Sequence, residues 1–462
     1  MLSTSEDLNC PGCQFNSLQV AAKVLHDDAE LEPEPLQARD VLGALSTDDI
    51  LSHSYWAELT PAGHVGGAAS EKLMESITVD IWSLCWATTP THYTLPQVLP
   101  NIYPGNPAMN PALSKFMLKS TPKSILNPQP EMNTAIPLNT GATIPALGLG
   151  TWQSGPGQVK KAVVHAIESG YRHIDCAFCY QNEDEVGDAL QDVISRGIVK
   201  REDLFITSKL WCTFHTRAEE GLQKSLDMLK TPYVDLYLMH WPVPMNPNGK
   251  PKAPSCVLLE LTTKGNHPLF PKLEDGSRDI DRSITHQDTW KNLEKLIQAH
   301  PEKVKAIGVA NYSVKYLEKL LAKATIIPAV NQIENHPLCP QQEVVDFCKE
   351  KGIHITAYSP LGSTDTPLFK DEVVNEVAKK HSVGPAVVLL SYHLARNSSV
   401  LAKSVTPSRI EENSKLISLD GEDMEKLENL HKAKGINRFV YPPFGVDCGF
   451  PDKAGGMDLS GP

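Results

Sequence analysis

The sequence predicts an α/β protein in which a (β/α)8 barrel with an N-terminal β-hairpin cap follows a poorly structured extension. Two observations from residue 133 onward predict this fold class. Short apolar runs alternate with amphipathic helical patterns, and eight such runs occur. Strands that are apolar on both faces and alternate with helices form a parallel sheet that helices cover. Eight units favour a closed barrel over an open, doubly wound sheet.

The barrel elements follow one another in a regular order. A hairpin over residues 135–145, with a turn at Asn139-Thr140-Gly141, comes first and is expected to cap the bottom of the barrel. The apolar runs are Leu147–Trp152, His173–Ala177, Leu204–Leu210, Val234–Trp241, Ala306–Asn311, Ala329–Ile333, His354–Ser359 and Val400–Val405. Between them, apolar residues recur three and four positions apart, which predicts helices. These helices are Val159–Glu168, Glu183–Ser195, Glu219–Leu229, Trp290–Ala299, Val314–Ala322, Gln342–Lys351 and Asp371–His381.

Two segments are longer than a simple crossover requires. They are Pro242–Thr285, after the fourth apolar run, and the tail from Gly435 onward. Long loops are usually functional, and a loop that follows a barrel strand lies at the carboxyl end of the barrel. Both segments are therefore expected to influence which ligand the barrel accepts.

Residues 1–130 differ from the rest of the chain in composition. They contain 13 of the 36 Pro, and 14 acidic residues against 6 basic ones. Proline at this density interrupts helices and is excluded from central strands. We expect an acidic, flexible or weakly structured extension over residues 1–130 and a barrel domain over residues 133–462. The alternative, that the segment is not part of the working protein, stays open on sequence alone.

Composition and charge disfavour several classes of partner. The net charge is -12 and no basic block occurs, so nucleic acid is not expected. No apolar run approaches the roughly 18 residues of a membrane helix, and the acidic start is unlike a secretory signal. The ten Cys show no framework spacing, and Cys10 and Cys13 lack the second pair of a zinc site. We expect a cytoplasmic monomer with reduced thiols and no bound metal.

Four polar residues lie at the ends of three successive apolar runs. Asp175 lies near the end of the second run, and Tyr180 follows it five residues later. Lys209 stands near the end of the third run and His240 near the end of the fourth. In a parallel barrel the carboxyl ends of the strands meet on one face, so these side chains are expected to converge.

These four residue types suit one chemical task. An ammonium group beside a phenol favours the tyrosinate, so Lys209 is expected to lower the pKa of Tyr180, and Asp175 to keep the lysine charged. Tyr180 then acts as a general acid and base near neutral pH. A neutral His240 can donate a hydrogen bond to a substrate oxygen and orient it. Such a tyrosine suits carbonyl reduction, which adds a hydride to carbon and a proton to oxygen.

Nine motifs, in order, resemble those of the aldo-keto reductase family, and they span about residues 133–462. They are the hairpin, Leu149-Gly150-Thr151-Trp152, Gly170-Tyr171-Arg172-His173-Ile174-Asp175, Ser208-Lys209-Leu210-Trp211, Leu238-Met239-His240-Trp241-Pro242, Gly308-Val309-Ala310-Asn311-Tyr312-Ser313, Asn331-Gln332-Ile333-Glu334, Ala357-Tyr358-Ser359-Pro360-Leu361-Gly362 and Lys403-Ser404-Val405-Thr406-Pro407. The resemblance implies a (β/α)8 barrel and NADPH-dependent reduction of an aldehyde or ketone to the alcohol, reversible toward alcohol or polyol oxidation. It also implies a catalytic tetrad in which Tyr180 donates the proton, while C4 of the nicotinamide donates the hydride. That tetrad is Asp175, Tyr180, Lys209 and His240.

The resemblance further implies that NADP(H) binds across the top of the barrel. No Gly-x-Gly-x-x-Gly motif follows a strand, so the dinucleotide fold of that type is not supported. Asn311 and Gln332 would bind the nicotinamide amide, and Tyr358 would stack on the ring. Lys403 and Arg409, at a strand–helix junction, would hold the 2′-phosphate of NADP. The other implied cofactor residues are Gly150, Thr151, Trp152, Asp175, Ser359, Leu361, Ser363, Ser404, Val405 and Thr406, with Glu412 and Asn413 at the adenine.

The residues beside the tetrad are mostly aromatic, and the matching family positions line an apolar pocket. Such a pocket suits a small aldehyde, ketone or polyol, although ordinary rim packing explains the same pattern. The implied substrate residues are Trp152, Phe178, Cys179, Trp211, His240 and Trp241. Two other functions stay open: a nicotinamide-sensing or interaction subunit with little turnover, and a binding protein that acts through the acidic extension.

Overall fold

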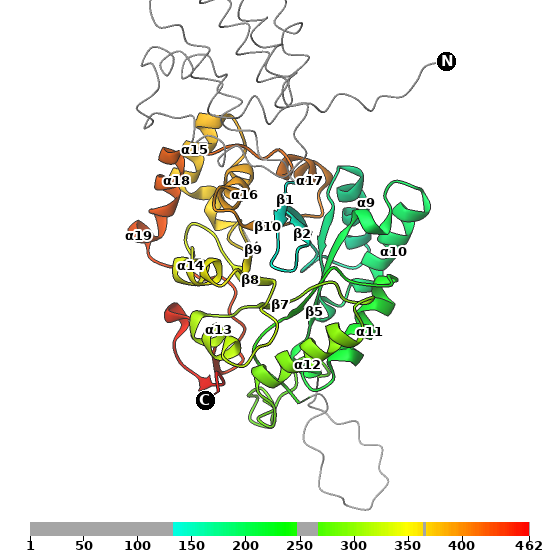
Figure 1. Cartoon of the computed structure of the whole chain (residues 1–462). Coiled ribbons are helices and arrows are strands. Elements are labelled where there is room, and N and C mark those ends of the chain that lie inside the picture. Colours follow the sequence, from blue (N-terminus) through cyan, green and yellow to red (C-terminus); the bar gives the residue numbers. More distant parts are fainter. Residues whose placement is uncertain (1–132, 247–266, 364–365, 462) are drawn as a thin grey trace, which may run out of the picture. The chain divides into compact units, whose positions relative to one another are not determined.

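The computed structural model describes residues 133–246, 267–363 and 366–461. Eight parallel strands close into a barrel in the order β10-β3-β4-β5-β6-β7-β8-β9, which confirms the predicted fold class (Figure 1). The strands are β3 (Leu147–Gly150), β4 (His173–Asp175), β5 (Phe205–Leu210), β6 (Leu236–Met239), β7 (Ile307–Ala310), β8 (Val330–Glu334), β9 (His354–Tyr358) and β10 (Ser399–Lys403). The predicted extension over residues 1–130, with Cys10 and Cys13, lies outside the described residues.

A two-stranded antiparallel hairpin precedes the barrel. It pairs β1 (Ala135–Pro137) with β2 (Thr143–Pro145). Ile144 on β2 is buried in one cluster with Phe205 and Leu236, the first residues of β5 and β6. Because these barrel residues begin their strands, the hairpin packs against the amino-terminal end of the barrel, as predicted.

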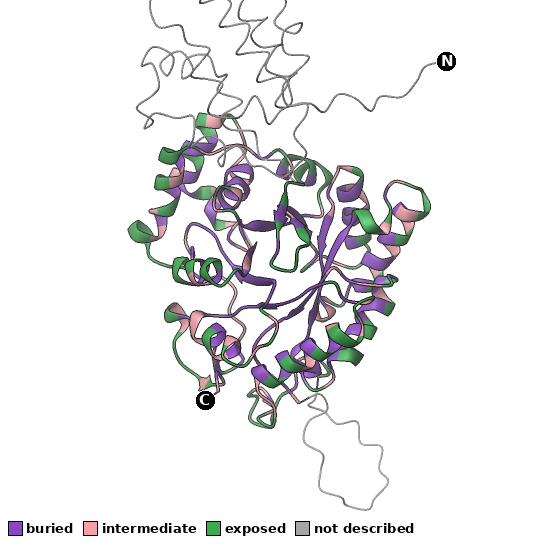
Figure 2. Cartoon of the chain, in the orientation of Figure 1, coloured by how far each residue is buried: buried purple, intermediate pink, exposed green. Residues whose placement is uncertain are grey.

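Helices surround the strands, with their exposed sides outward and their buried sides toward the sheet (Figure 2). All seven predicted helices are present, and α12 begins four residues earlier than predicted. The helices are α9 (Val159–Glu168), α10 (Glu183–Ser195), α11 (Ala218–Leu229), α12 (His286–Ala299), α13 (Val314–Leu321), α14 (Gln342–Glu350), α15 (Glu372–His381), α16 (Pro385–Ala395), α17 (Pro407–Asn413), α18 (Gly421–Glu428) and α19 (Leu430–Lys434). Two short strands of the C-terminal tail pair in parallel, β11 (Val446–Asp447) and β12 (Met457–Asp458).

Helix α16 is the main helix that the periodicity did not predict. Its residues 387–393 are all buried, because α16 packs against β10 and against α15, α17 and α18. A helix that is covered on most sides is apolar on most sides, so it lacks the polar stripe on which the periodic pattern depends. Local amphipathicity therefore missed it.

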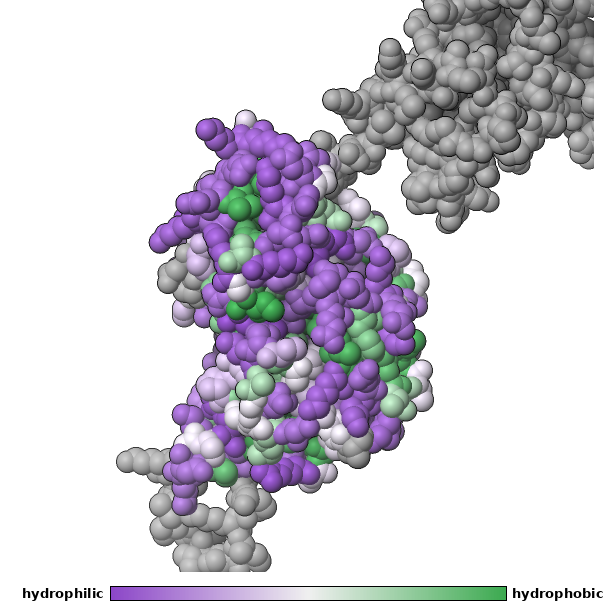
Figure 3. Space-filling view, turned by 90° about the vertical axis from the view of Figure 1, so that its left-hand side faces the viewer, coloured by the Kyte–Doolittle hydropathy of each residue, from purple (hydrophilic) through white to green (hydrophobic). Residues whose placement is uncertain are grey.

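The outer surface on the side of α14, α15, α18 and α19 is mostly hydrophilic, with apolar residues in small separate groups (Figure 3). Among the described helices, none combines the length and the apolar character that crossing a membrane requires.

The described parts of both long segments pack at the carboxyl end of the barrel. In the β6–α12 segment, the backbone oxygen of Leu269 accepts a hydrogen bond from Trp211 Nε1 at 2.6 Å. The tail is held by Glu334, the buried last residue of β8, which accepts from the backbone N–H groups of Phe439 and Val440 at 2.6 and 2.8 Å. These anchors bring side chains from both segments to the strand ends.

Candidate active site

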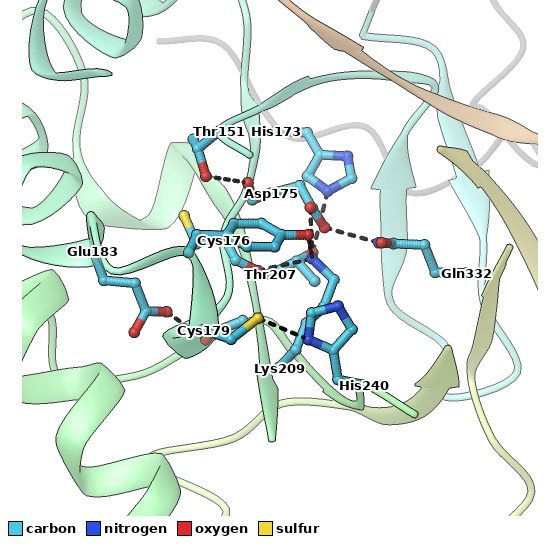
Figure 4. A network of polar contacts seen from close by, with 12 residues as sticks. Thr151, His173, Asp175, Cys176, Cys179, Glu183, Thr207, Lys209, His240 and Gln332 are labelled. Carbon is cyan, nitrogen blue, oxygen red and sulfur yellow. Dashed lines mark hydrogen bonds and ion pairs between the residues drawn. The ribbon is translucent and has the colours of Figure 1, made fainter. Parts of the chain in front are cut away.

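Asp175 and Lys209 form a buried ion pair at the strand ends (Figure 4). Lys209 is fully buried on β5, and its Nζ donates to Asp175 Oδ1 at 2.6 Å and to the backbone oxygen of Cys176 at 2.8 Å. A longer contact of 3.4 Å joins Nζ to the phenolic oxygen of Tyr180, which lies on the 3-10 turn Phe178–Tyr180. The ion pair thus holds an ammonium group against a phenol.

His240 follows β6 and completes the predicted set. Its ring packs edge-on against Tyr180, with ring centroids 5.8 Å apart, and its Nδ1 lies 3.5 Å from Cys179 Sγ. Burial, together with the charge of Lys209, holds the pKa of His240 well below its ordinary value. The imidazole is therefore neutral at pH 7, and the structure brings all four predicted side chains together.

The pKa of Tyr180 does not lie below its ordinary value, as the prediction for Lys209 required. Burial of the phenol raises the pKa of Tyr180 well above its ordinary value, and the charge of Asp175 raises it further. Lys209 makes its shortest contacts with Asp175 and with a backbone oxygen, and lies farther from the phenol. The carboxylate of Asp175 offsets the charge of Lys209, so desolvation of the phenol decides the direction in which the pKa of Tyr180 shifts. Tyr180 consequently keeps its proton at pH 7.

Gln332 binds the other oxygen of Asp175. Its Nε2 donates to Asp175 Oδ2 at 2.8 Å, as Figure 4 shows. Strands β4 and β8 stand on opposite sides of the closed barrel, so this hydrogen bond crosses the barrel interior. The sequence singled out Gln332 for the cofactor but contained no signal for this contact, because the pattern does not show which strands face each other.

Glu183, in the first turn of α10, is a buried carboxyl that the sequence analysis missed. Its Oε1 accepts from Ser208 Oγ at 2.6 Å, whereas its Oε2 has no partner among the described residues. Burial raises the pKa of Glu183 to about 7, against the opposing effect of the Ser208 hydrogen bond. An acid in a first helical turn ordinarily lies at the surface and interacts with the helix dipole, so nothing in the local pattern predicts its burial.

We expect Glu183 to make the fold less stable as the pH rises. The pKa is raised from 4.5 to about 7 on folding, so its stabilisation is complete below pH 4.5 and is lost as the pH rises through 7. A shift of this size corresponds to about 3 kcal/mol. Glu183→Gln is neutral at every pH, so urea unfolding from about pH 5 to about pH 8 should show a smaller loss of stability than in the parent.

The matched control for this prediction is Glu343→Gln, which changes an exposed acid in the first turn of α14. This control should retain the parental pH dependence. If Glu183→Gln also retained it, the buried carboxyl would not be the group that titrates.

Asn311 and Tyr358 lie next to the tetrad. Tyr358 Oη donates to Asn311 Oδ1 at 2.7 Å, and Asn311 Nδ2 donates to the backbone oxygen of His240 at 2.8 Å. Asn311 and Ser359, just past the ends of β7 and β9, have left-handed φ angles of 64° and 49°. Non-glycine residues in this region are strained, and such strain clusters at functional sites.

The residues predicted for the far end of the cofactor lie around the end of β10. Lys403 is exposed, and its Nζ donates to the backbone oxygen of Gln153 at 3.1 Å. Arg409 is exposed on α17, and Ser404 Oγ accepts from the backbone N–H of Thr406 at 3.1 Å. The remaining predicted cofactor residues are buried (Thr151, Asn413), partly buried (Gly150, Leu361, Ser363, Val405) or exposed (Trp152, Glu412).

An aromatic wall adjoins His240. Trp211 packs edge-on against His240 and Phe270, both at 5.2 Å between ring centroids, and lies 6.4 Å from Phe444. Trp241 meets the same Phe444 at 5.5 Å. Phe270 and Phe444 come from the two long segments and were not predicted individually, since the fold of those loops decides which side chain reaches the wall.

The other predicted pocket residues have different surroundings. Cys179 contacts His240, as described above. The ring of Phe178 packs against Phe214 at 5.1 Å. Trp152 is 39% exposed and makes no ring contact within the described residues.

The barrel, the tetrad and the aromatic wall agree with one sequence family. The sequence profile of the Aldo/keto reductase family matches residues 146–432. The chain belongs to the aldo-keto reductase family. This aldo-keto reductase is therefore an oxidoreductase of carbonyl and alcohol groups, in a family whose members use a nicotinamide cofactor.

The alignments with this aldo-keto reductase cover nearly the whole length of its named relatives. The D-galacturonate reductase of Hypocrea jecorina is 54% identical over 325 residues, which are 70% of this chain and 99% of the relative. The glycerol 2-dehydrogenase (NADP(+)) of Saccharomyces cerevisiae is 47% identical over 317 residues, or 67% and 95% of the two chains. The solved aldose reductase of Schistosoma japonicum has a TM-score of 0.58 at 38% identity, covering 66% of this chain and 94% of that one.

Proposed function

We propose that this aldo-keto reductase reduces an aldehyde or ketone to the alcohol with NADPH, and that the reverse reaction oxidises an alcohol or polyol. The observation that carries the proposal is the phenolic oxygen of Tyr180, which lies 3.4 Å from Lys209 Nζ, with the ring of His240 packed edge-on beside it. Two such donors suit one carbonyl oxygen, which gains negative charge as it is reduced. A sensing or interaction subunit would not require a proton donor.

Each member of the tetrad then has a separate task. When bound, the nicotinamide cofactor would supply the hydride for the carbonyl carbon. Tyr180 donates its proton to the carbonyl oxygen, and the ammonium of Lys209 stabilises the tyrosinate that remains. Asp175 holds that ammonium in place at 2.6 Å. His240 orients the carbonyl oxygen toward the phenol.

The polar atoms left free around Asn311 and Gln332 match a carboxamide. Nε2 of Gln332 donates to Asp175, which leaves Oε1 as an acceptor. Oδ1 of Asn311 accepts from Tyr358 while one N–H donates to the backbone of His240, which leaves the second N–H as a donor. A carboxamide offers the complementary acceptor and donor. This fit supports nicotinamide binding by these two residues, with Tyr358 against the ring.

Lys403 and Arg409 are both exposed and support a preference for NADPH over NADH, because only NADPH carries the additional 2′-phosphate that these two cations would bind. Arg409→Ala should weaken NADPH binding by roughly 10-fold to 100-fold, the value of a hydrogen bond to a charged group. NADH binding should change little. Fluorescence titration of both cofactors measures the effect. Lys415→Ala, which removes an exposed cation just after α17, is the control, and equal losses for both cofactors in Arg409→Ala would contradict the assignment.

We extend the proposal to aldehydes that also carry a carboxylate. The relative of 54% identity is named as a D-galacturonate reductase. Arg278 lies beside the aromatic wall, with Cζ 5.2 Å from the ring centroid of Phe270, and donates to the Phe270 backbone oxygen at 3.0 Å. Phe270 in turn packs against Trp211. The remaining N–H groups of the guanidinium suit a carboxylate, which supports this substrate class.

The loss of NADPH absorbance with the purified full-length protein tests both parts of the proposal. D-galacturonate and D-galactose form a matched pair that differs in the carboxylate. We expect turnover with both and a lower KM for the uronate. Equal KM values would reject the carboxylate preference alone. Tight NADPH binding without turnover of these sugars or of an aromatic aldehyde would reject the reductase and favour the sensing alternative.

A further inference from the structure

Cys179 lies directly before Tyr180 in the chain, and its side chain reaches His240 rather than the phenol. Its Sγ is 3.5 Å from His240 Nδ1, within hydrogen-bonding distance for sulfur, and Figure 4 shows this contact at the edge of the tetrad. Burial raises the pKa of the Cys179 thiol above its ordinary value. The sulfur therefore keeps its hydrogen and can donate it.

The ring of His240 is held on two sides. Tyr180 and Trp211 both pack edge-on against it, at 5.8 and 5.2 Å between centroids. The backbone oxygen of His240 also accepts from Asn311, so the main chain is held as well. Because the ring is neutral, only one of its two nitrogens carries a proton.

We infer that Cys179 is a positioning residue that donates its S–H to His240 Nδ1 and thereby keeps the ring proton on Nε2. An imidazole nitrogen is a strong acceptor and a thiol sulfur a weak one, so S–H to nitrogen is favoured over the reverse arrangement. His240 Nε2 has no hydrogen bond within the described residues, and it is not among their fully buried polar atoms that lack a partner. It is the atom left to donate to a ligand.

The consequence rests on the proposed function. With the proton on Nε2, the ring donates a hydrogen bond to the carbonyl oxygen. In the other tautomer Nε2 presents a lone pair, which repels that oxygen. Cys179 would thus contribute to turnover without contacting the reacting atoms, through the orientation of a donor.

Two variants separate this role from simple packing. Cys179→Val removes the donor at similar volume, and Cys179→Ser keeps a donor. We expect Cys179→Val to lower kcat/KM by about fivefold to tenfold, the value of one neutral hydrogen bond, with NADPH affinity unchanged. Cys179→Ser should recover at least part of that loss. Cys339→Val, at a buried cysteine elsewhere in the barrel, controls for the general effect of losing a thiol.

Nitrogen-15 NMR of histidine-labelled full-length protein reads the tautomer directly, whether or not the protein turns over an aldehyde. We expect His240 Nε2 to be protonated and Nδ1 unprotonated in the parent, and a mixture of tautomers in Cys179→Val. A protonated Nδ1 in the parent would overturn the inference even if the variants failed to fold. So would a Cys179→Val variant with parental kcat/KM, or a Cys179→Ser variant no more active than it. Failure of the proposed function would instead appear as an absence of turnover with the predicted tautomer intact.

Discussion

Replacement of Tyr180 by Phe should lower kcat by roughly 100-fold to 10,000-fold, the range for loss of a positioned general acid. The change removes one oxygen, which lies 3.4 Å from Lys209 Nζ. His240 does not replace it as a proton donor, because the lowered pKa of its imidazolium leaves the ring neutral at pH 7. NADPH affinity should stay close to the parental value, since the phenol is not among the predicted cofactor residues. Steady-state kinetics and a fluorescence titration measure the two quantities.

Tyr237→Phe is the matched control for this variant. Tyr237 lies fully buried on β6, and its hydroxyl has no partner among the described residues. Loss of that hydroxyl should leave turnover at the parental rate and should not reduce stability, because an unpaired buried polar group is removed. A Tyr180→Phe variant with parental activity would show that the assigned proton donor is wrong.

Replacement of Lys209 by Met should destabilise the fold by about 3–5 kcal/mol, because it leaves the carboxylate of Asp175 buried without its cation. The side chains of the pair are 0% and 4% exposed, and the two charged atoms are 2.6 Å apart. Turnover should also fall, because the tyrosinate that forms at Tyr180 loses its nearest cation. Denaturant unfolding at neutral pH measures the stability term, and Lys349→Met, at an exposed position of α14, is the control.

A double-mutant cycle makes the prediction for Lys209 more specific. When Asp175→Asn is combined with Lys209→Met, no buried charge remains, so the double variant should be more stable than the sum of the two single losses implies. Additive losses would mean that the pair is solvated in solution, in conflict with its burial here.

The arrangement of the barrel was predictable because its signal is local. Helices α9 and α10 begin and end at the predicted residues. Their apolar residues lie on one side of each helix, and this periodic pattern stops where the helix stops. The eight strands occur where apolar runs were found. Helix α16 was missed for the opposite reason: it is buried on most sides, so its sequence carries no amphipathic period.

The candidate site divides in the same way. The sequence predicted that Asp175, Lys209 and His240 lie on one face, because they stand at the ends of parallel strands and all strands of a parallel barrel end on that face. The hydrogen bond from Gln332 to Asp175 crosses the barrel interior, and the ring of Phe444 arrives from the tail. Neither contact has a local signal, since the partners are far apart in the chain.

What the sequence alone determined is the alternation of strands and helices and the identity of the chemical groups at the strand ends. Both follow from periodicity, because backbone geometry fixes which side chains share a face. Only the tertiary structure decided that burial raises the pKa of Tyr180, that Cys179 contacts His240, and that two long loops supply the aromatic wall. These features depend on desolvation and on distances between remote residues, which packing of the whole chain sets.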